Sequence, residues 1–185
     1  MRGQVASAGQ AAAQSQPAGS VSTFPTWEVS GGYQLLHTED QTFPFGLNLD
    51  GAWNFNDMFG AVGEVGWAMD SEDLGEDVDS SLHAWNIGAG PRWNARTAGT
   101  PWPYAQVLVG VLHGRGSVEG PGVDFSDSTT NFMLQPGVGV NVIAGDGWGI
   151  VGQVDYRRVF TDEDETGESG INQFPVFIGG RMILE

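Results

Sequence analysis

The chain contains three histidines, His37, His83 and His113, which are the residue type best suited to bind a metal or to act as a general base near neutral pH. Each falls near the end of a predicted strand, and the strands that carry His37 and His83 are not neighbours in sequence. One three-histidine metal site would therefore require rearranged loops. We interpret the histidines as residues at the rim of the fold, because no constellation of catalytic groups accompanies them.

A second candidate for chemistry is the pair Ser81 and His83. Two residues apart on a strand, they would face the same side, and they invite comparison with the serine and histidine of lipid deacylases, although sequence alone cannot establish the geometry of a triad. No motif identifies the acid that would complete a triad. We therefore predict no catalytic residues and no cofactor, and we keep a lipid-modifying enzyme as the alternative.

Clustered carboxylates form the third candidate, in Asp70-Ser71-Glu72-Asp73 and Asp162-Glu163-Asp164-Glu165. Carboxylate oxygens are the ligands that Ca²⁺ and Mg²⁺ prefer, although no acidic residue occupies the twelfth position of an EF-hand loop counted from Asp162. Solvated charge is the alternative to a formed site. We predict weak divalent-cation binding at Asp70, Glu72, Asp73, Asp162 and Asp164.

The composition narrows the classes of protein that can present these groups. The 185 residues suit one domain, and seven basic residues, all arginine, oppose 23 acidic ones for a net charge of −16. Nucleic acid is not expected as a partner, because phosphate binding needs clustered positive charge. The chain has no cysteine and no apolar run near the ~20 residues of a membrane helix.

The stretch from Phe45 to Met69 shows the main structural signal. Apolar and polar residues alternate from Phe45 to Phe55 and again from Phe59 to Met69, on either side of a short turn. Two runs of period two separated by a turn indicate a long antiparallel hairpin. The aromatic residues lie near the ends of the apolar face, which is typical of a strand whose apolar face meets lipid.

The same alternation predicts eight strands, joined by connections that are alternately long and short. Most of the 23 acidic residues lie in the odd-numbered connections, of which 114–130 is predicted to be the longest loop. In an up-and-down meander these connections emerge at one end. Besides the hairpin, the predicted strands are 26–37, 82–93, 102–113, 132–142, 148–157 and 174–184.

Alternation alone does not separate a membrane barrel from a soluble barrel with an apolar interior. Two patterns favour an inward polar face. Glycines are more numerous on the polar face, as the narrow interior of eight strands requires, and the aromatics form a belt at each end of the apolar face. The predicted membrane-interface aromatics are Trp27, Trp53, Phe55, Phe59, Trp67, Trp85, Trp93, Trp102, Trp148 and Tyr156.

Charged residues on the polar face nearly balance. In a narrow lumen such charges must pair or remain hydrated, so we predict an ion-pair network that fills the barrel and leaves no continuous pore. The predicted members are Glu28, Asp50, Glu64, Arg92, Asp155, Arg157 and Arg181.

The residues from Trp27 to Leu184 resemble the small eight-stranded outer-membrane barrels, which include the OmpA-type transmembrane domain, OmpX and the opacity proteins. Besides the strand pattern, the resemblance rests on the phrases Gly88-Ala89-Gly90-Pro91-Arg92-Trp93, Pro136-Gly137-Val138-Gly139-Val140 and Val154-Asp155-Tyr156-Arg157. It implies an outer membrane of the Gram-negative type and roles in envelope integrity or surface interaction, with a small channel as a further alternative.

We therefore predict an all-β, eight-stranded antiparallel transmembrane barrel over residues 26–185, expected to be a monomer that contacts outer-membrane lipid and lipopolysaccharide. Residues 1–25 are predicted to be a disordered tail. Within them, Ala6-Ser7-Ala8 has the form of a signal-peptidase site. A chance match and the remnant of a secretion signal both fit that motif.

Overall fold

The computed structural model describes residues 24–38, 42–73, 79–96, 99–120, 123–145, 147–161 and 170–184. All of its regular structure is antiparallel β-sheet, and no helix capable of crossing a membrane occurs in this part of the chain. The strands are β1 (Trp27–Thr38), β2 (Thr42–Phe43), β3 (Phe45–Asn54), β4 (Phe59–Asp73), β5 (Asp79–Asn94), β6 (Trp102–Gly120), β7 (Val123–Gly145), β8 (Trp148–Asp155), β9 (Arg157–Phe160) and β10 (Ile171–Leu184).

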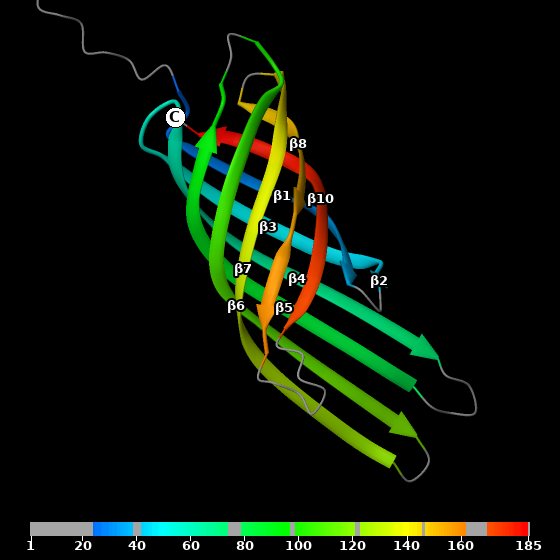
Figure 1. Cartoon of the computed structure of the whole chain (residues 1–185). Coiled ribbons are helices and arrows are strands. Elements are labelled where there is room, and N and C mark those ends of the chain that lie inside the picture. Colours follow the sequence, from blue (N-terminus) through cyan, green and yellow to red (C-terminus); the bar gives the residue numbers. More distant parts are fainter. Residues whose placement is uncertain are drawn as a thin grey trace, which may run out of the picture.

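The sheet closes on itself into a barrel of eight strands (Figure 1). Around the eight positions of the ring each strand pairs with its neighbour along the chain, and β1 pairs with β10 from Trp27↔Leu184 to Thr38↔Gln173. β8 and β9 together make one position in the ring, since both pair with β7 and β10 and only Tyr156 separates them. β2 is a short addition beside β1. The predicted fold class is confirmed.

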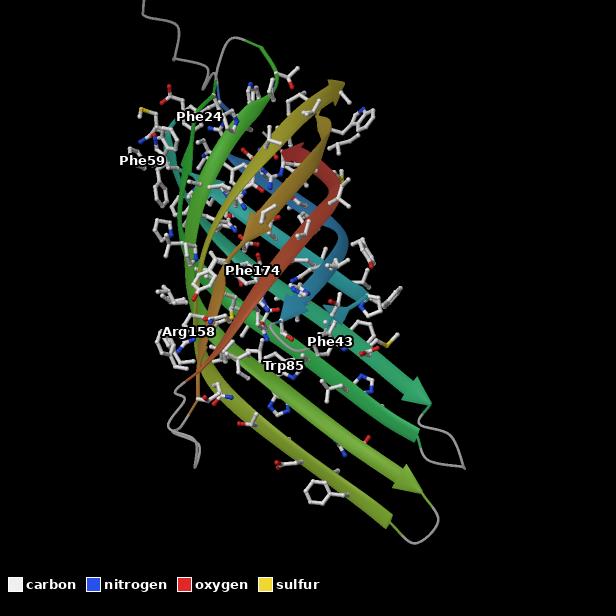
Figure 2. All side chains as sticks on the ribbon, turned by 45° about the vertical axis from the view of Figure 1, so that its right-hand side comes forward. Phe24, Phe43, Phe59, Trp85, Arg158 and Phe174 are labelled. Carbon is white, nitrogen blue, oxygen red and sulfur yellow. The ribbon has the colours of Figure 1, made fainter. Side chains whose placement is uncertain are left out.

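The two faces of the barrel have the predicted chemistry. Along β3 every second residue is exposed, so that Leu49 is 61% exposed while the adjacent Asp50 is 5% exposed. Figure 2 shows Phe59 near the end with short turns, and Trp85 and Phe174 nearer the other end. All three are exposed on the outer surface. Apolar side chains therefore face outward and polar side chains face the lumen.

The strands continue past the point where loops were expected. β4 and β5 stay paired to Asp73 and Asp79, and β6 and β7 stay paired to Gly120 and Val123. The predicted loop 114–130 was therefore wrong, and so were the ends of the predicted loop 70–80. Small and polar residues predominate in these stretches. A strand pair with water on both sides needs no apolar face, so its sequence does not have to alternate.

These continuations form a four-stranded sheet that projects beyond the barrel, at the end opposite the carboxyl terminus (Figure 1). The pairing of β3 with β4 stops at Met69, and that of β9 with β7 stops at Phe132, so the flanking strands are shorter. We call this sheet the extension. It comprises residues 70–73, 79–82, 114–120 and 123–131.

Closure of the barrel depends on close backbone approach at Gly32, whose partner across the seam is Gly179. A Cβ added at Gly32 would overlap the carbonyl oxygen of Ile178 and the Cα of Gly179. We expect Gly32→Val to reduce the free energy of unfolding by about 1–3 kcal/mol, because backbone atoms at the seam would have to separate. Urea unfolding in lipid vesicles measures this change.

Gly180 provides the matched control on the same seam. It lies on the outward face, and a Cβ added there meets no atom within 4 Å. Gly180→Val is expected to leave the free energy of unfolding nearly unchanged. Equal destabilisation by both substitutions would contradict the close approach at Gly32.

Candidate functional site

A first cluster of ion pairs lies inside the barrel, toward the end with short turns. Arg181 donates to Glu28 at 2.9 Å and lies 3.4 Å from Asp50, and Arg92 lies 3.1 Å from the same Asp50 oxygen. Arg96, in the connection after β5, also pairs with Glu28. Several strands and one connection are thereby tied together across the lumen.

A second cluster lies nearer the extension. The guanidinium of Arg157 is 3.6 Å from Glu64, and its Nε donates to Gln135 Oε1 at 2.6 Å. Gln135 in turn donates from Nε2 to Glu64 at 3.1 Å, and Arg157 Nη1 donates to Gln173 Oε1 at 3.3 Å. The carboxylate and the guanidinium are therefore joined both directly and through an amide.

Tyr104 extends the first cluster across the lumen. Its ring lies 4.5 Å from the guanidinium carbon of Arg92 and 5.2 Å from that of Arg181, which places two cations over one aromatic ring. Its hydroxyl donates to Gln153 at 2.6 Å, and Gln153 donates to Asp155 at 2.8 Å. Asp155 is thus reached through hydrogen bonds.

The structure places all seven sequence-predicted lumen residues inside the barrel, each no more than 5% exposed. Arg96 joins the three predicted arginines, so that four arginines balance the four carboxylates of the lumen. These carboxylates belong to Glu28, Asp50, Glu64 and Asp155. A buried charge is costly unless it is paired and hydrogen-bonded, so a balanced set of charges is the expected composition of a closed lumen. Apolar side chains fill much of the remaining cross-section, among them Leu108, Met133 and Phe177.

Sequence reasoning missed Arg96 and Tyr104. Tyr104 could have been found, because it shares the inward phase of Gln106 on β6. Arg96 carried no such signal, since it follows the end of β5 at Asn94, where alternation no longer assigns a face.

Nine of the ten predicted interface aromatics are exposed on the outer surface. At the end with short turns Trp27 stacks on Trp53 with ring centres 5.9 Å apart, and Phe55 meets Trp53 edge-on at 4.8 Å. Trp102 differs from the prediction, because it stands in the inward phase of β6 with its ring 5.8 Å from the guanidinium of Arg96. The nine exposed residues are Trp27, Trp53, Phe55, Phe59, Trp67, Trp85, Trp93, Trp148 and Tyr156.

The histidines lie apart on the outer rim near the extension. His83 stacks on Trp67 at 6.5 Å, and His113 Nδ1 lies 2.7 Å from the Thr130 hydroxyl. His37, on β1, contacts the Thr42 hydroxyl at 2.8 Å.

The remaining candidates for chemistry are Ser81 and the acidic clusters. The Ser81 hydroxyl pairs with that of Ser117 at 2.8 Å rather than with an imidazole. Within the described residues no group of three histidine, aspartate or glutamate side chains is placed to hold a metal. Asp162 and Asp164 of the predicted divalent site lie outside the described residues, as do the side chains of Glu72 and Asp73.

The chain was compared with known proteins. A family model described as the outer membrane protein beta-barrel domain matches residues 5–174. Among similar solved structures, the attachment invasion locus protein Ail of Yersinia pestis, in complex with the heparin analogue sucrose octasulfate, is 17% identical with a TM-score of 0.55. The match covers 84% of this chain and 96% of that chain.

Two further structures show the same architecture. Neisserial surface protein A is 15% identical with a TM-score of 0.60, over 85% of this chain and 96% of that chain. A major outer membrane protein of Thermus thermophilus is 13% identical with a TM-score of 0.62, over 84% of this chain and 98% of that chain. A search of curated proteins found no match.

The family model spans most of the chain, and the apolar outer surface with aromatics toward both ends is what such a family requires. The predicted resemblance and the predicted location in an outer membrane of the Gram-negative type are therefore confirmed. The chain belongs to the outer membrane protein beta-barrel domain family.

Proposed function

We propose that this protein is a non-enzymatic outer-membrane anchor that displays the extension to a positively charged protein surface outside the cell. The barrel holds the extension at a fixed position and does not conduct ions. This proposal keeps the predicted surface-interaction role but transfers it from flexible loops to a sheet. It also takes the barrel to be a monomer surrounded by outer-membrane lipid and lipopolysaccharide.

The continuation of the strand pairing beyond the barrel is the observation that carries the proposal. Nineteen residues of β6 and 23 of β7 belong to strands, far more than the ~9–11 needed to cross a membrane. Residues 125–130 of β7 are all exposed. Ordered strands that exceed the membrane requirement present a fixed surface to a partner, which lowers the entropy lost on binding.

The charge of this end of the molecule supports a basic partner. The segment 114–130 contains Glu119, Asp124 and Asp127 against a single arginine, Arg115, and the segment 70–80 adds further carboxylates with no basic residue. Such a field attracts cationic surfaces and speeds encounter with them. It would also draw divalent cations loosely to the same end.

The packed lumen supports the other half of the proposal. Both ion-pair clusters and the aromatic ring of Tyr104 lie buried across the barrel interior, where a conducting channel would need water. We expect no steady conductance in planar bilayers. Stable channel openings would contradict the anchor role.

Neutralising Glu119, Asp124 and Asp127 to glutamine or asparagine tests the display role. We expect binding of the nanodisc-embedded protein to immobilised poly-L-lysine at physiological salt to weaken markedly, because the cationic surface loses its complementary charges on the extension. Biolayer interferometry at two salt concentrations measures the effect.

A matched control removes the same charge elsewhere, by changing Glu163, Glu165 and Glu168 in the last connection to glutamine. This variant is expected to retain most of the binding. If both variants lose affinity equally, only the net charge matters, and the extension is not the binding surface.

A further inference from the structure

A cavity of about 520 Å³ opens at the mouth of the barrel, next to the second ion-pair cluster, and the extension forms part of its wall. It is lined by residues of β1, β2, β5, β6, β7, β9 and β10, so most of the ring of strands contributes to its wall. We call it the vestibule. The lining residues that matter for the argument are Phe43, Leu82, Leu112, Gly114, Val159 and Gln173.

The inward-facing wall of the vestibule is largely apolar. On one side Leu36, Phe43 and Ala68 pack together with Leu82, and on the other Leu112, Met133 and Val159 form a separate cluster. These side chains stand in the inward phase of their strands, away from lipid. The two clusters are separate, and Phe43, Leu82, Leu112 and Val159 all line the vestibule.

The apolar side chains of this wall are themselves well shielded, since Phe43 is 6%, Leu112 8% and Val159 1% exposed. Leu82 is only partly buried and packs against the cluster that contains Phe43. The cavity is therefore bordered by a packed apolar surface. A cavity of 520 Å³ is within the range of roughly 300–1,000 Å³ typical of small-molecule sites, which are mainly apolar with a few polar groups.

The floor of the vestibule is closed. Gln173 lines the cavity, and its Oε1 accepts the hydrogen bond from Arg157, which is held by Gln135 and Glu64 beneath it. A molecule that enters from the mouth therefore meets a buried ion pair. It would be bound at that position and would not be passed through the barrel.

The polar part of the wall selects for an uncharged ligand. Asn131 donates from Nδ2 to the Thr129 hydroxyl at 3.3 Å, and both residues line the cavity in the inward phase of β7 together with Asp127. His83 and Arg115 also border the cavity, but they stand in the outward phase of β5 and β6, and the His83 ring lies on Trp67. The inward groups thus offer hydrogen bonds and one carboxylate, which would repel an anion.

We propose that the vestibule is a binding site for an uncharged, mainly apolar small molecule with one hydrogen-bonding group, such as a medium-chain alcohol. The apolar body lies between the two clusters, and the hydroxyl meets Thr129, Asn131 or Gln173. This site shares part of its wall with the extension, but its ligand and its test differ from those of the interaction proposed for the extension.

Photolabelling of the protein in lipid nanodiscs tests the proposal. The probe is decanol carrying a diazirine, and labelled residues are mapped by mass spectrometry. We expect labels on Leu112 and Val159 in addition to lipid-facing residues. Excess unlabelled 1-decanol should suppress the vestibule labels, because that site is saturable, and should leave the lipid-facing labels largely unchanged.

Gly114→Phe fills the vestibule, since a Cβ added at Gly114 meets no atom within 4 Å and the position lines the cavity. We expect this variant to lose the vestibule labels. Gly63→Phe is the matched control, because Gly63 has equally open space on the lipid-facing side. It should retain them.

Several outcomes would overturn the proposal. These are labels confined to lipid-facing residues, vestibule labels that 1-decanol does not suppress, and vestibule labels that persist in a folded Gly114→Phe variant. Equal labelling by the corresponding diazirine fatty acid would overturn the preference for an uncharged ligand. If Gly114→Phe does not fold, as judged by its gel mobility before and after boiling, the competition experiment on the unaltered protein decides.

Discussion

Replacing Arg157 by methionine is expected to lower the free energy of unfolding by about 3–5 kcal/mol, because removal of one partner leaves a buried charge uncompensated. Glu64 is 2% exposed, and its ion pair is with Arg157. The amides of Gln135 and Asn86 still donate to the carboxylate, but they supply no positive charge. Urea unfolding in lipid vesicles, followed by tryptophan fluorescence, measures the loss.

The double variant Arg157→Met/Glu64→Gln separates the cost of the orphaned charge from the loss of packing. When both charges are removed, neither the Glu64 carboxylate nor the Arg157 guanidinium is left as a buried charge without the other, and we expect most of the stability to return. Additive losses from the two single substitutions would contradict the pairing. Arg158→Met, at the adjacent residue but half-buried and bonded to Asn172, is expected to cost less than about 1 kcal/mol.

The facing of the strands could be predicted from sequence because two different environments act on alternate residues. Lipid admits Leu49 and excludes Asp50, and no other arrangement satisfies both side chains on one strand. The same reasoning located the seven lumen charges. It could not pair them, because Arg92 and Arg181 come from strands distant in sequence and meet at Asp50 only when the ring closes.

The extension could not be predicted because its environment is the same on both sides. Water surrounds both faces of 125–130, so apolar and polar residues do not have to alternate there. The serine and threonine residues of this segment, and the glycines that precede it in 114–130, are typical of a loop. Its strands form because the ladder of hydrogen bonds simply continues outward from the barrel. Trp102 was misplaced for a related reason, since it was assigned by its height along the barrel instead of by its phase on β6.

The vestibule escaped prediction because inward positions were expected to be polar at every height. Leu112 and Val159 are inward and apolar, and in sequence they look like ordinary members of a strand. Only the closed ring shows that these two line one cavity together with Phe43 and Leu82. Apolar residues at these inward positions depart from that expectation, and such departures tend to mark functional positions.

Placing an arginine on the lipid-facing side at Val65 is expected to reduce the stability of the inserted barrel by about 2–4 kcal/mol. Val65 is 52% exposed on the outer surface and lies between Phe59 and Trp67, which belong to the two aromatic belts. The hydrocarbon core cannot solvate a guanidinium, so the cost is greatest there. Unfolding in vesicles and the fraction of heat-modifiable protein after refolding report the change.

The size of this effect depends on depth in the membrane, and the turn between β3 and β4 provides the comparison. Met58 is also well exposed, at 46%, but it lies in the turn where a guanidinium reaches water and lipid head groups. Met58→Arg should therefore cost about 0–1 kcal/mol. Similar costs at both positions would mean that the outer surface does not span a hydrocarbon layer between Phe59 and Trp67. The two substitutions introduce the same side chain at exposed positions of one hairpin. The difference between their losses of stability therefore reports the cost of placing a guanidinium in the hydrocarbon layer and not a disturbance of packing.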